Sequence, residues 1–251
     1  MLYQALSKLN YHAQMNVFLR LLKHSKVGAF LIHGAADHGQ RWLLNRLMGH
    51  AIRTSDDLVL PISFGYWDRR DLSVILQKIG ERLNLRRNSS LQEIIEHLHA
   101  CWQKRSVILI FRDAGDVPPP LLRDLKEQFW DVLVQRTRRG PSPQEQARLL
   151  LFLVDEAGNV GEWPFSCAEQ PDASWSPDVP VKPPMITPIG VADLTTWMQI
   201  VCEDLPAKIR DTPAQIIWQQ AREGIPQLVL EHLCELGNCE WLEMEHVWMK
   251  Y

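Results

Sequence analysis

The chain has 251 residues, of which 46% are hydrophobic and 23% are charged. This composition predicts a folded globular protein with one large core, or with a core domain and a smaller appendage. The formal net charge of −3 argues against general nucleic-acid binding, and the five scattered cysteines, which form no C-x-x-C pair, argue against a disulfide framework.

Residues 1–26 predict a helical lead-in and not an export signal, because polar residues interrupt the apolar ones. No later segment approaches the roughly 18 uninterrupted apolar residues of a membrane helix. We therefore expect a cytoplasmic protein that does not enter a membrane.

Residues 27–160 alternate apolar runs with amphipathic stretches. The runs that predict strands are "KVGAFLIHG", "DDLVLPISFG", "SVILIFRD" and "ARLLLFLVDE", and helical spacing predicts helices between them. Ser90, three residues before Glu93, predicts a helix N-cap. Parallel strands need crossovers of this length, so the order indicates an α/β fold, in which a parallel sheet has helices on both faces.

The pattern changes in residues 161–190, which are rich in proline, serine and aspartate and show no sustained period. We expect a long ordered loop there, and a short edge strand within it is an open alternative. Trp163 and Trp175 in this loop are candidates for a contact surface, because aromatic residues are enriched at interface centres. Residues 191–251 have helical spacing and predict a small helical C-terminal module.

The stretch "LIHGAADHGQRWLLNRL" follows the first predicted strand and begins a helix. Gly34 and Gly39 have the spacing of the P-loop pattern G-x-x-x-x-G-K-[ST], in which backbone N–H groups hold phosphates. We expect Gly34–Gln40 to form the turn between strand and helix. Trp42 or Leu43 should then lie on the core side of that helix.

The two positions after the second glycine depart from the pattern, since Gln40 replaces the lysine and Arg41 replaces the magnesium-binding hydroxyl. A neutral amide lacks the charge that phosphoryl transfer needs, and a fixed cation repels Mg²⁺. We therefore expect slow or absent turnover and no metal. Magnesium-independent nucleotide binding stays open, because the backbone N–H groups of a helix N-terminus survive these substitutions.

Asp113 follows the third predicted strand, where a P-loop protein places the acid that holds Mg²⁺. With arginine at position 41, that carboxylate would face a guanidinium in place of a metal. We expect Arg41 to pair with Asp113, or otherwise with Asp116 or Asp155. A solvent-facing Arg41 is the alternative.

Five segments in order, "GAFLIHGAADHGQRWLLNRL", "VILIFRDAGDV", "RLLLFLVDEAG", "ITPIGVADLTTWM" and "GIPQLVLEHL", resemble the signal-transduction ATPases with numerous domains, the STAND class of P-loop proteins. The "GIP" of Gly224–Pro226 is similar to the G-x-P motif of this class, whose proline lies against adenine. Gln40 and Arg41 resemble the inactive STAND domains of bacterial, often cyanobacterial, signalling and conflict systems.

This resemblance implies a P-loop NTPase-like sheet and an adaptor or scaffold derived from a nucleotide switch. It implies effector, peptidase, NTPase or repeat-protein partners. It also implies that Pro226 lies at the sheet edge near the glycine loop. The nucleotide-binding-like positions are Gly34, Gly39, Gln40, Arg41, Asp113 and Pro226.

Two other functions stay open. An atypical NTPase with a rebuilt site would need a cation from elsewhere, and "WDRRD" offers Arg69 and Arg70, which otherwise read as solvated residues or partner contacts. A nucleic-acid adaptor would use "LNLRRNSS" and "RTRRG", although two short basic patches on an acidic chain argue against it.

Overall fold

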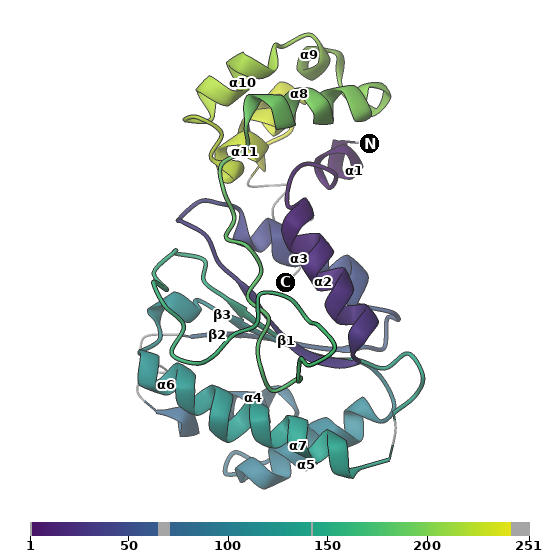
Figure 1. Ribbon diagram of the computed structural model, residues 1–251, viewed down its shortest axis with the longest axis vertical. Helices are drawn as coiled ribbons and strands as arrows, with labels where there is room; N and C mark the ends of the chain where they lie inside the picture. The colour runs from purple at the N-terminus through teal and green to yellow at the C-terminus, as the bar shows by residue number, and fades with distance from the viewer. Residues whose placement is uncertain (1, 65–70, 142, 242–251) are drawn as a thin grey trace.

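The computed structural model describes residues 2–64, 71–141 and 143–241, and its centre is a parallel four-stranded sheet (Figure 1). The strands have the order β1-β4-β3-β2 across the sheet. They are β1 (Val27–Ile32), β2 (Leu58–Ser63), β3 (Val107–Arg112) and β4 (Leu149–Val154). The four predicted strands and the α/β class are thus confirmed.

The side chains of the central strands divide the core in two. Phe30 of β1 and Phe152 of β4 face one hydrophobic cluster, whereas their neighbours Leu31 and Leu153 face the other. Alternate residues of a strand point to opposite faces, so an uninterrupted apolar run is what a sheet covered on both sides requires.

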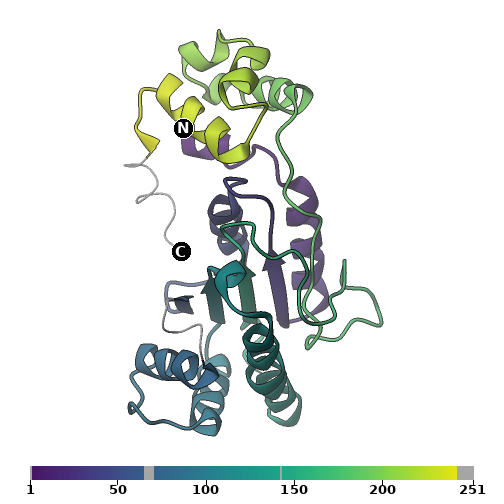
Figure 2. The ribbon, with the colours of Figure 1, turned by 90° about the vertical axis from the view of Figure 1, so that its left-hand side faces the viewer.

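Helices cover both faces (Figures 1 and 2). The helices α2 (His12–His24) and α3 (Gln40–Ala51) lie on one face. The other face is covered by α4 (Leu72–Arg82), α5 (Leu91–Trp102), α6 (Pro119–Asp124) and α7 (Asp131–Arg139), with a π-helical turn at Leu125–Trp130 between α6 and α7. The predicted cap of α5 is present as a capping box, in which the hydroxyl of Ser90 accepts from the N–H of Glu93 and the carboxylate of Glu93 accepts from the N–H of Ser90.

The segment after β4 returns along the free edge of β1. The N–H of Leu31 donates to the carbonyl oxygen of Val181 over 2.9 Å, and the N–H of Val181 donates to Ala29 over 2.8 Å. Farther along, the N–H of Ile186 donates to His33 over 3.1 Å. The long loop is therefore ordered, and isolated single-residue bridges take the place of a continuous edge strand.

The C-terminal helices pack at the carboxyl end of β1, beside the short helix α1 (Leu2–Leu6) (Figures 1 and 2). They are α8 (Val191–Ile200), α9 (Ala207–Arg210), α10 (Ala214–Gln220) and α11 (Pro226–Leu236). The indole N–H of Trp197 donates to the carbonyl oxygen of Ala5 over 2.8 Å and joins α8 to α1. None of the helices among the described residues has the length and apolar character that a membrane crossing requires.

Candidate functional site

The glycine loop, residues 34–39, lies between β1 and α3, as predicted, and it is one residue shorter than expected because Gln40 is already the first residue of α3. Gly39 has φ of 75° at the position before α3, in the left-handed region that favours glycine. Trp42 and Leu43, in the first turn of α3, are fully buried. The strand, turn and helix of a phosphate-binding loop are therefore all present.

Gln40 closes this loop from the inside. Its side chain is 3% exposed, and its amide nitrogen donates to the carbonyl oxygen of Ala35 over 2.7 Å. A P-loop lysine at this position would extend to the β- and γ-phosphates. Here the side chain is used to hold the loop's own backbone.

Tyr11 supports the loop from the segment before α2. Its hydroxyl donates to the carbonyl oxygen of His38 over 3.1 Å and occupies the space that a Cβ atom on Gly39 would need. Burial raises the pKa of Tyr11 far above its usual value, so this hydroxyl stays a neutral donor. The sequence analysis missed Tyr11, because nothing near it in the sequence marks it as a partner of the loop.

The segment after β4 packs on the loop from another side. Gly158 has φ of 70°, and a Cβ atom there would come within 2.7 Å of the backbone nitrogen of Ala36 and of the carbonyl oxygen of Gly34. Gly34 itself forms a bridge with Ile186. Only a residue without a side chain permits backbone to approach backbone this closely.

Pro226 lies beside the glycine loop, as the resemblance implied. A Cβ atom on Gly39 would be 3.7 Å from the Cβ atom of Pro226. The next N–H along α11, that of Gln227, donates to the carbonyl oxygen of Asp37 over 3.0 Å. The first N–H groups of a helix have no partner within it, so this bond satisfies one of them and fastens the helical module to the loop.

A small cavity of about 260 Å³ opens beside the loop. Its described lining residues are Asp37, Gly39, Gln40, Arg41, Glu156, Gln227 and Glu231. The lining thus contains three acidic residues and one arginine, and the carboxylate of one of the acids, Glu156, is bonded to Arg112. A nucleotide's phosphates would meet repulsion here and would have to displace Gln40 from Ala35, so the residues present do not fit an ATP·Mg²⁺ group.

The strand order shows which strand ends lie next to the glycine loop. β4 lies between β1 and β3, so Asp113 follows a strand that is not adjacent to the glycine loop. Asp155 does follow the adjacent strand, but its two carboxylate oxygens accept from the backbone N–H groups of Asn159 and Val160, over 3.0 and 2.8 Å. Asp116 accepts from the side chain of Asn159.

The ion pairs between described residues do not include one from Arg41 to Asp113, Asp116 or Asp155. The pair that does lie at this edge joins Arg112 to Glu156, with nitrogen–oxygen distances of 2.5 and 2.9 Å. Arg112 is the last residue of β3, and Glu156 follows the last residue of β4 by two positions. Charged residues at the carboxyl ends of two predicted strands are the sequence signal that could have identified the pair. The expected pair between Arg41 and an acid at a strand end is therefore not among these bonds, and Arg112 is the partner of Glu156.

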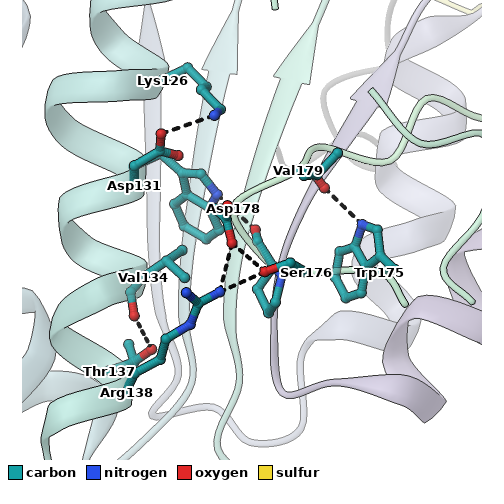
Figure 3. Close-up of polar contacts among 11 residues, drawn as sticks. Lys126, Asp131, Val134, Thr137, Arg138, Trp175, Ser176, Asp178 and Val179 are labelled. Carbon is teal, nitrogen blue, oxygen red and sulfur yellow. Dashed lines mark hydrogen bonds and ion pairs between the residues drawn. The ribbon is translucent and has the colours of Figure 1, made fainter. Parts of the chain in front are cut away.

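The loop tryptophans have structural contacts, and Figure 3 shows those of Trp175. Trp163 is only 9% exposed and packs on Phe165 in the core, which corrects the idea that its indole forms a contact surface. Trp175 is half-buried, and its indole N–H donates to the carbonyl oxygen of Val179 over 2.8 Å. Arg69 and Arg70 lie outside the described residues.

The basic stretch at the end of α7 is already engaged. Arg136 pairs with Glu96 over 2.8 Å, and Arg138 pairs with Asp178 over 2.6 Å (Figure 3). These bonds reduce the positive charge that the "RTRRG" stretch can offer to nucleic acid. Within the described residues, no group of three or more histidine, cysteine or acidic side chains is placed to hold a metal ion.

Comparison with known proteins agrees with this geometry. A search of curated proteins gives no match to the chain. A scan against protein families matches residues 6–154, more than half of the chain, to a family described as inactive STAND. The matched region contains the sheet, the glycine loop and the helices on both faces. The chain therefore belongs to the inactive STAND family.

Proposed function

We propose that this protein is a catalytically inactive adaptor in bacterial signalling or defence, which holds partner proteins and does not turn over nucleotide. The observation that carries the proposal is the hydrogen bond from Gln40 to Ala35, which uses the P-loop lysine position to close the loop. Membership of the inactive STAND family supports it.

The chemistry of phosphoryl transfer supports the loss of catalysis. The transition state needs cations around the transferring phosphate, and here a neutral amide, a misplaced guanidinium and three carboxylates surround that position. We propose that no nucleotide is needed for function.

The glycine loop is held in place by other parts of the chain, as suits a scaffold. Tyr11, Gly158, Ile186 and Gln227 reach the loop from four segments of the chain. A nucleotide switch needs a loop that exchanges contacts between states. A glycine loop that is held by other segments of the same chain does not exchange contacts, so the surfaces of the protein stay constant. These surfaces would bind an effector, a peptidase or a repeat protein in the cytoplasm.

The first experiment measures binding of ATP and ADP by calorimetry, with and without Mg²⁺, beside an assay of phosphate release. We expect neither binding nor release. Mg²⁺-dependent hydrolysis that is lost in Gln40→Ala or Asp113→Asn would overturn the proposal and make the protein an atypical NTPase.

The second experiment captures partners with the full chain, with and without ATP and Mg²⁺, and identifies the proteins that are retained. We expect an effector, peptidase or repeat protein in equal amounts under both conditions. The double variant Gln40→Lys with Arg41→Thr, which restores the P-loop residues, serves as the matched comparison. Capture that requires nucleotide would contradict the adaptor function.

A further inference from the structure

A second cavity, of about 480 Å³, lies at the opposite edge of the sheet, where the strands begin. We call it the amino-edge cleft. Its charged lining residues are Lys23, His24, Lys26, Arg53, Glu145 and Arg148. They come from the end of α2, from the residues after α3 and from the segments that lead into β1 and β4. Because Val27 pairs with Leu149, Lys26 and Arg148 stand next to each other on adjoining strands.

Arg148 is the fixed element of this cleft. It is 9% exposed, and its Nη1 donates to the carbonyl oxygen of His50, in the last turn of α3, over 2.7 Å. Across the described part of the chain, no other hydrogen bond and no ion pair of this guanidinium is found. A guanidinium held at one nitrogen presents its other N–H groups in a rigid fork, which suits phosphate.

The charges around Arg148 are not balanced. Burial lowers the pKa of Arg148, and the neighbouring cation of Arg53 lowers it further, while Asp57 opposes both. The carboxylate of Asp57 already accepts from the backbone N–H groups of Arg53, Thr54 and Ser106. These bonds do not remove the negative charge of Asp57, but Asp57 is not part of the cleft lining, and Glu145 is the only acid among the described residues that line it.

Helix ends explain part of this cluster. The carbonyl ends of α2 and α3 favour cations, which accounts for Lys23 and His24 in the last turn of α2. It does not account for Arg53, which lies beyond the end of α3 and lines the same cleft as the buried Arg148, an arrangement that a bound anion would stabilise.

We propose that the amino-edge cleft binds a small molecule with a phosphate or diphosphate group. Arg148 and Arg53 bind this group directly, and Lys23 and Lys26 complete the positively charged lining around it. A multiply charged oxyanion matches four cations around an open cleft, whereas a nucleic acid would need a positive field beyond the cleft, and the chain is acidic overall. This site is separate from the glycine loop, and it does not depend on the adaptor function.

The test titrates the full chain with inorganic pyrophosphate at constant ionic strength, followed by calorimetry and by the shift of the melting temperature. We expect saturable binding with a raised melting temperature. Arg53→Gln and Lys26→Gln change exposed side chains, so the variants fold, and each weakens binding by about tenfold. Arg148→Lys keeps the charge but loses the fork, and it weakens binding at least as much.

The control is Arg87→Gln, which removes the same charge from an exposed position away from the cleft and leaves pyrophosphate affinity unchanged. Three outcomes would overturn the proposal. They are no saturable binding to the wild-type chain, equal weakening by Arg53→Gln and Arg87→Gln, and binding of a single-stranded oligonucleotide without a response to pyrophosphate.

Discussion

The hydroxyl of Tyr11 lies in the space where a Cβ atom of Gly39 would stand, and it donates to the backbone of His38 in the same loop. Gly39 also has φ of 75°, which an alanine adopts only with strain. We predict that Gly39→Ala lowers the free energy of unfolding by about 2 to 3 kcal/mol, measured by urea titration.

Tyr11→Phe tests the cause of that loss. Alone, it removes one buried hydrogen bond and costs about 1 kcal/mol. Combined with Gly39→Ala, it also removes the oxygen that blocks the new Cβ atom, so the double variant should lose less than the sum of the two. Strictly additive losses would show that the hydroxyl does not restrict position 39.

Gln40 supplies the second prediction. Gln40→Met keeps the volume of the side chain but leaves the carbonyl oxygen of Ala35 without its partner in a buried loop. We expect a loss of about 1 to 2 kcal/mol in unfolding free energy. Gln215→Met, at an exposed position of α10, is the matched control and should change stability little. Equal effects of the two variants would remove the argument that Gln40 holds the loop.

Local patterns predicted most of the elements of this fold. Apolar runs and helical spacing involve neighbouring residues, and the cap formed by Ser90 and Glu93 spans only three positions. The order of strands is different, since it depends on which distant segments pair. Asp113 was expected near Arg41 because it follows a strand, yet β4 lies between that strand and β1.

Contacts between distant segments were also beyond the sequence analysis. Tyr11 and His38 are joined by a hydrogen bond, but no spacing rule connects them. Trp163 shows a related difficulty, because an indole in a proline-rich segment has the same sequence signal whether it faces solvent or fills the core. The position of Pro226 was predicted only because five short segments occur in the order of a known family.

His33 gives the third prediction, which concerns pH. Its Nε2–H donates to the carbonyl oxygen of Pro183 over 2.9 Å, and burial lowers its pKa below the usual 6.5, although the bond to Pro183 opposes that shift. The stability that neutral His33 contributes is therefore present above pH 6.5 and is lost as the pH falls toward the lower folded pKa, because the unfolded chain takes up the proton first.

The measurement is urea unfolding at three pH values between 7.5 and 5.5, as a rough window around the usual histidine pKa. The wild-type chain should lose stability across this range, and His33→Gln should make the loss smaller. His12→Gln, at an exposed position, should keep the wild-type slope. The same slope in both variants would assign the pH dependence to other groups.

The fourth prediction concerns the loop around Ser176. Arg138 donates to Ser176 and to Asp178, and the indole of Trp130 donates to Pro177 over 3.0 Å (Figure 3). Arg138→Gln removes the bonds from α7 to Ser176 and Asp178, so limited proteolysis should cut this loop faster. We expect a several-fold increase in the cleavage rate, which is about the factor that corresponds to the free energy of one charged hydrogen bond.

Arg139→Gln is the control for that experiment, since Arg139 is exposed and next to Arg138 in α7. It should leave the cleavage rate unchanged. Cleavage that is equally fast in both variants would mean that charge at the end of α7, and not the bonds of Arg138, holds the loop.

The bridge between Val181 and β1 limits how copies of this chain can join. Strand addition, in which a foreign chain extends a sheet, needs an edge with free N–H and carbonyl groups. On β1, the N–H of Leu31 and the carbonyl of Ala29 are already bonded to Val181. On β2, the outer strand at the other side of the described sheet, Pro61 has no N–H to offer. Both features disfavour strand addition at the edges of the described sheet, so we expect a protein partner to recognise side chains on helices and loops, where sequence changes can alter its choice without disturbing the sheet.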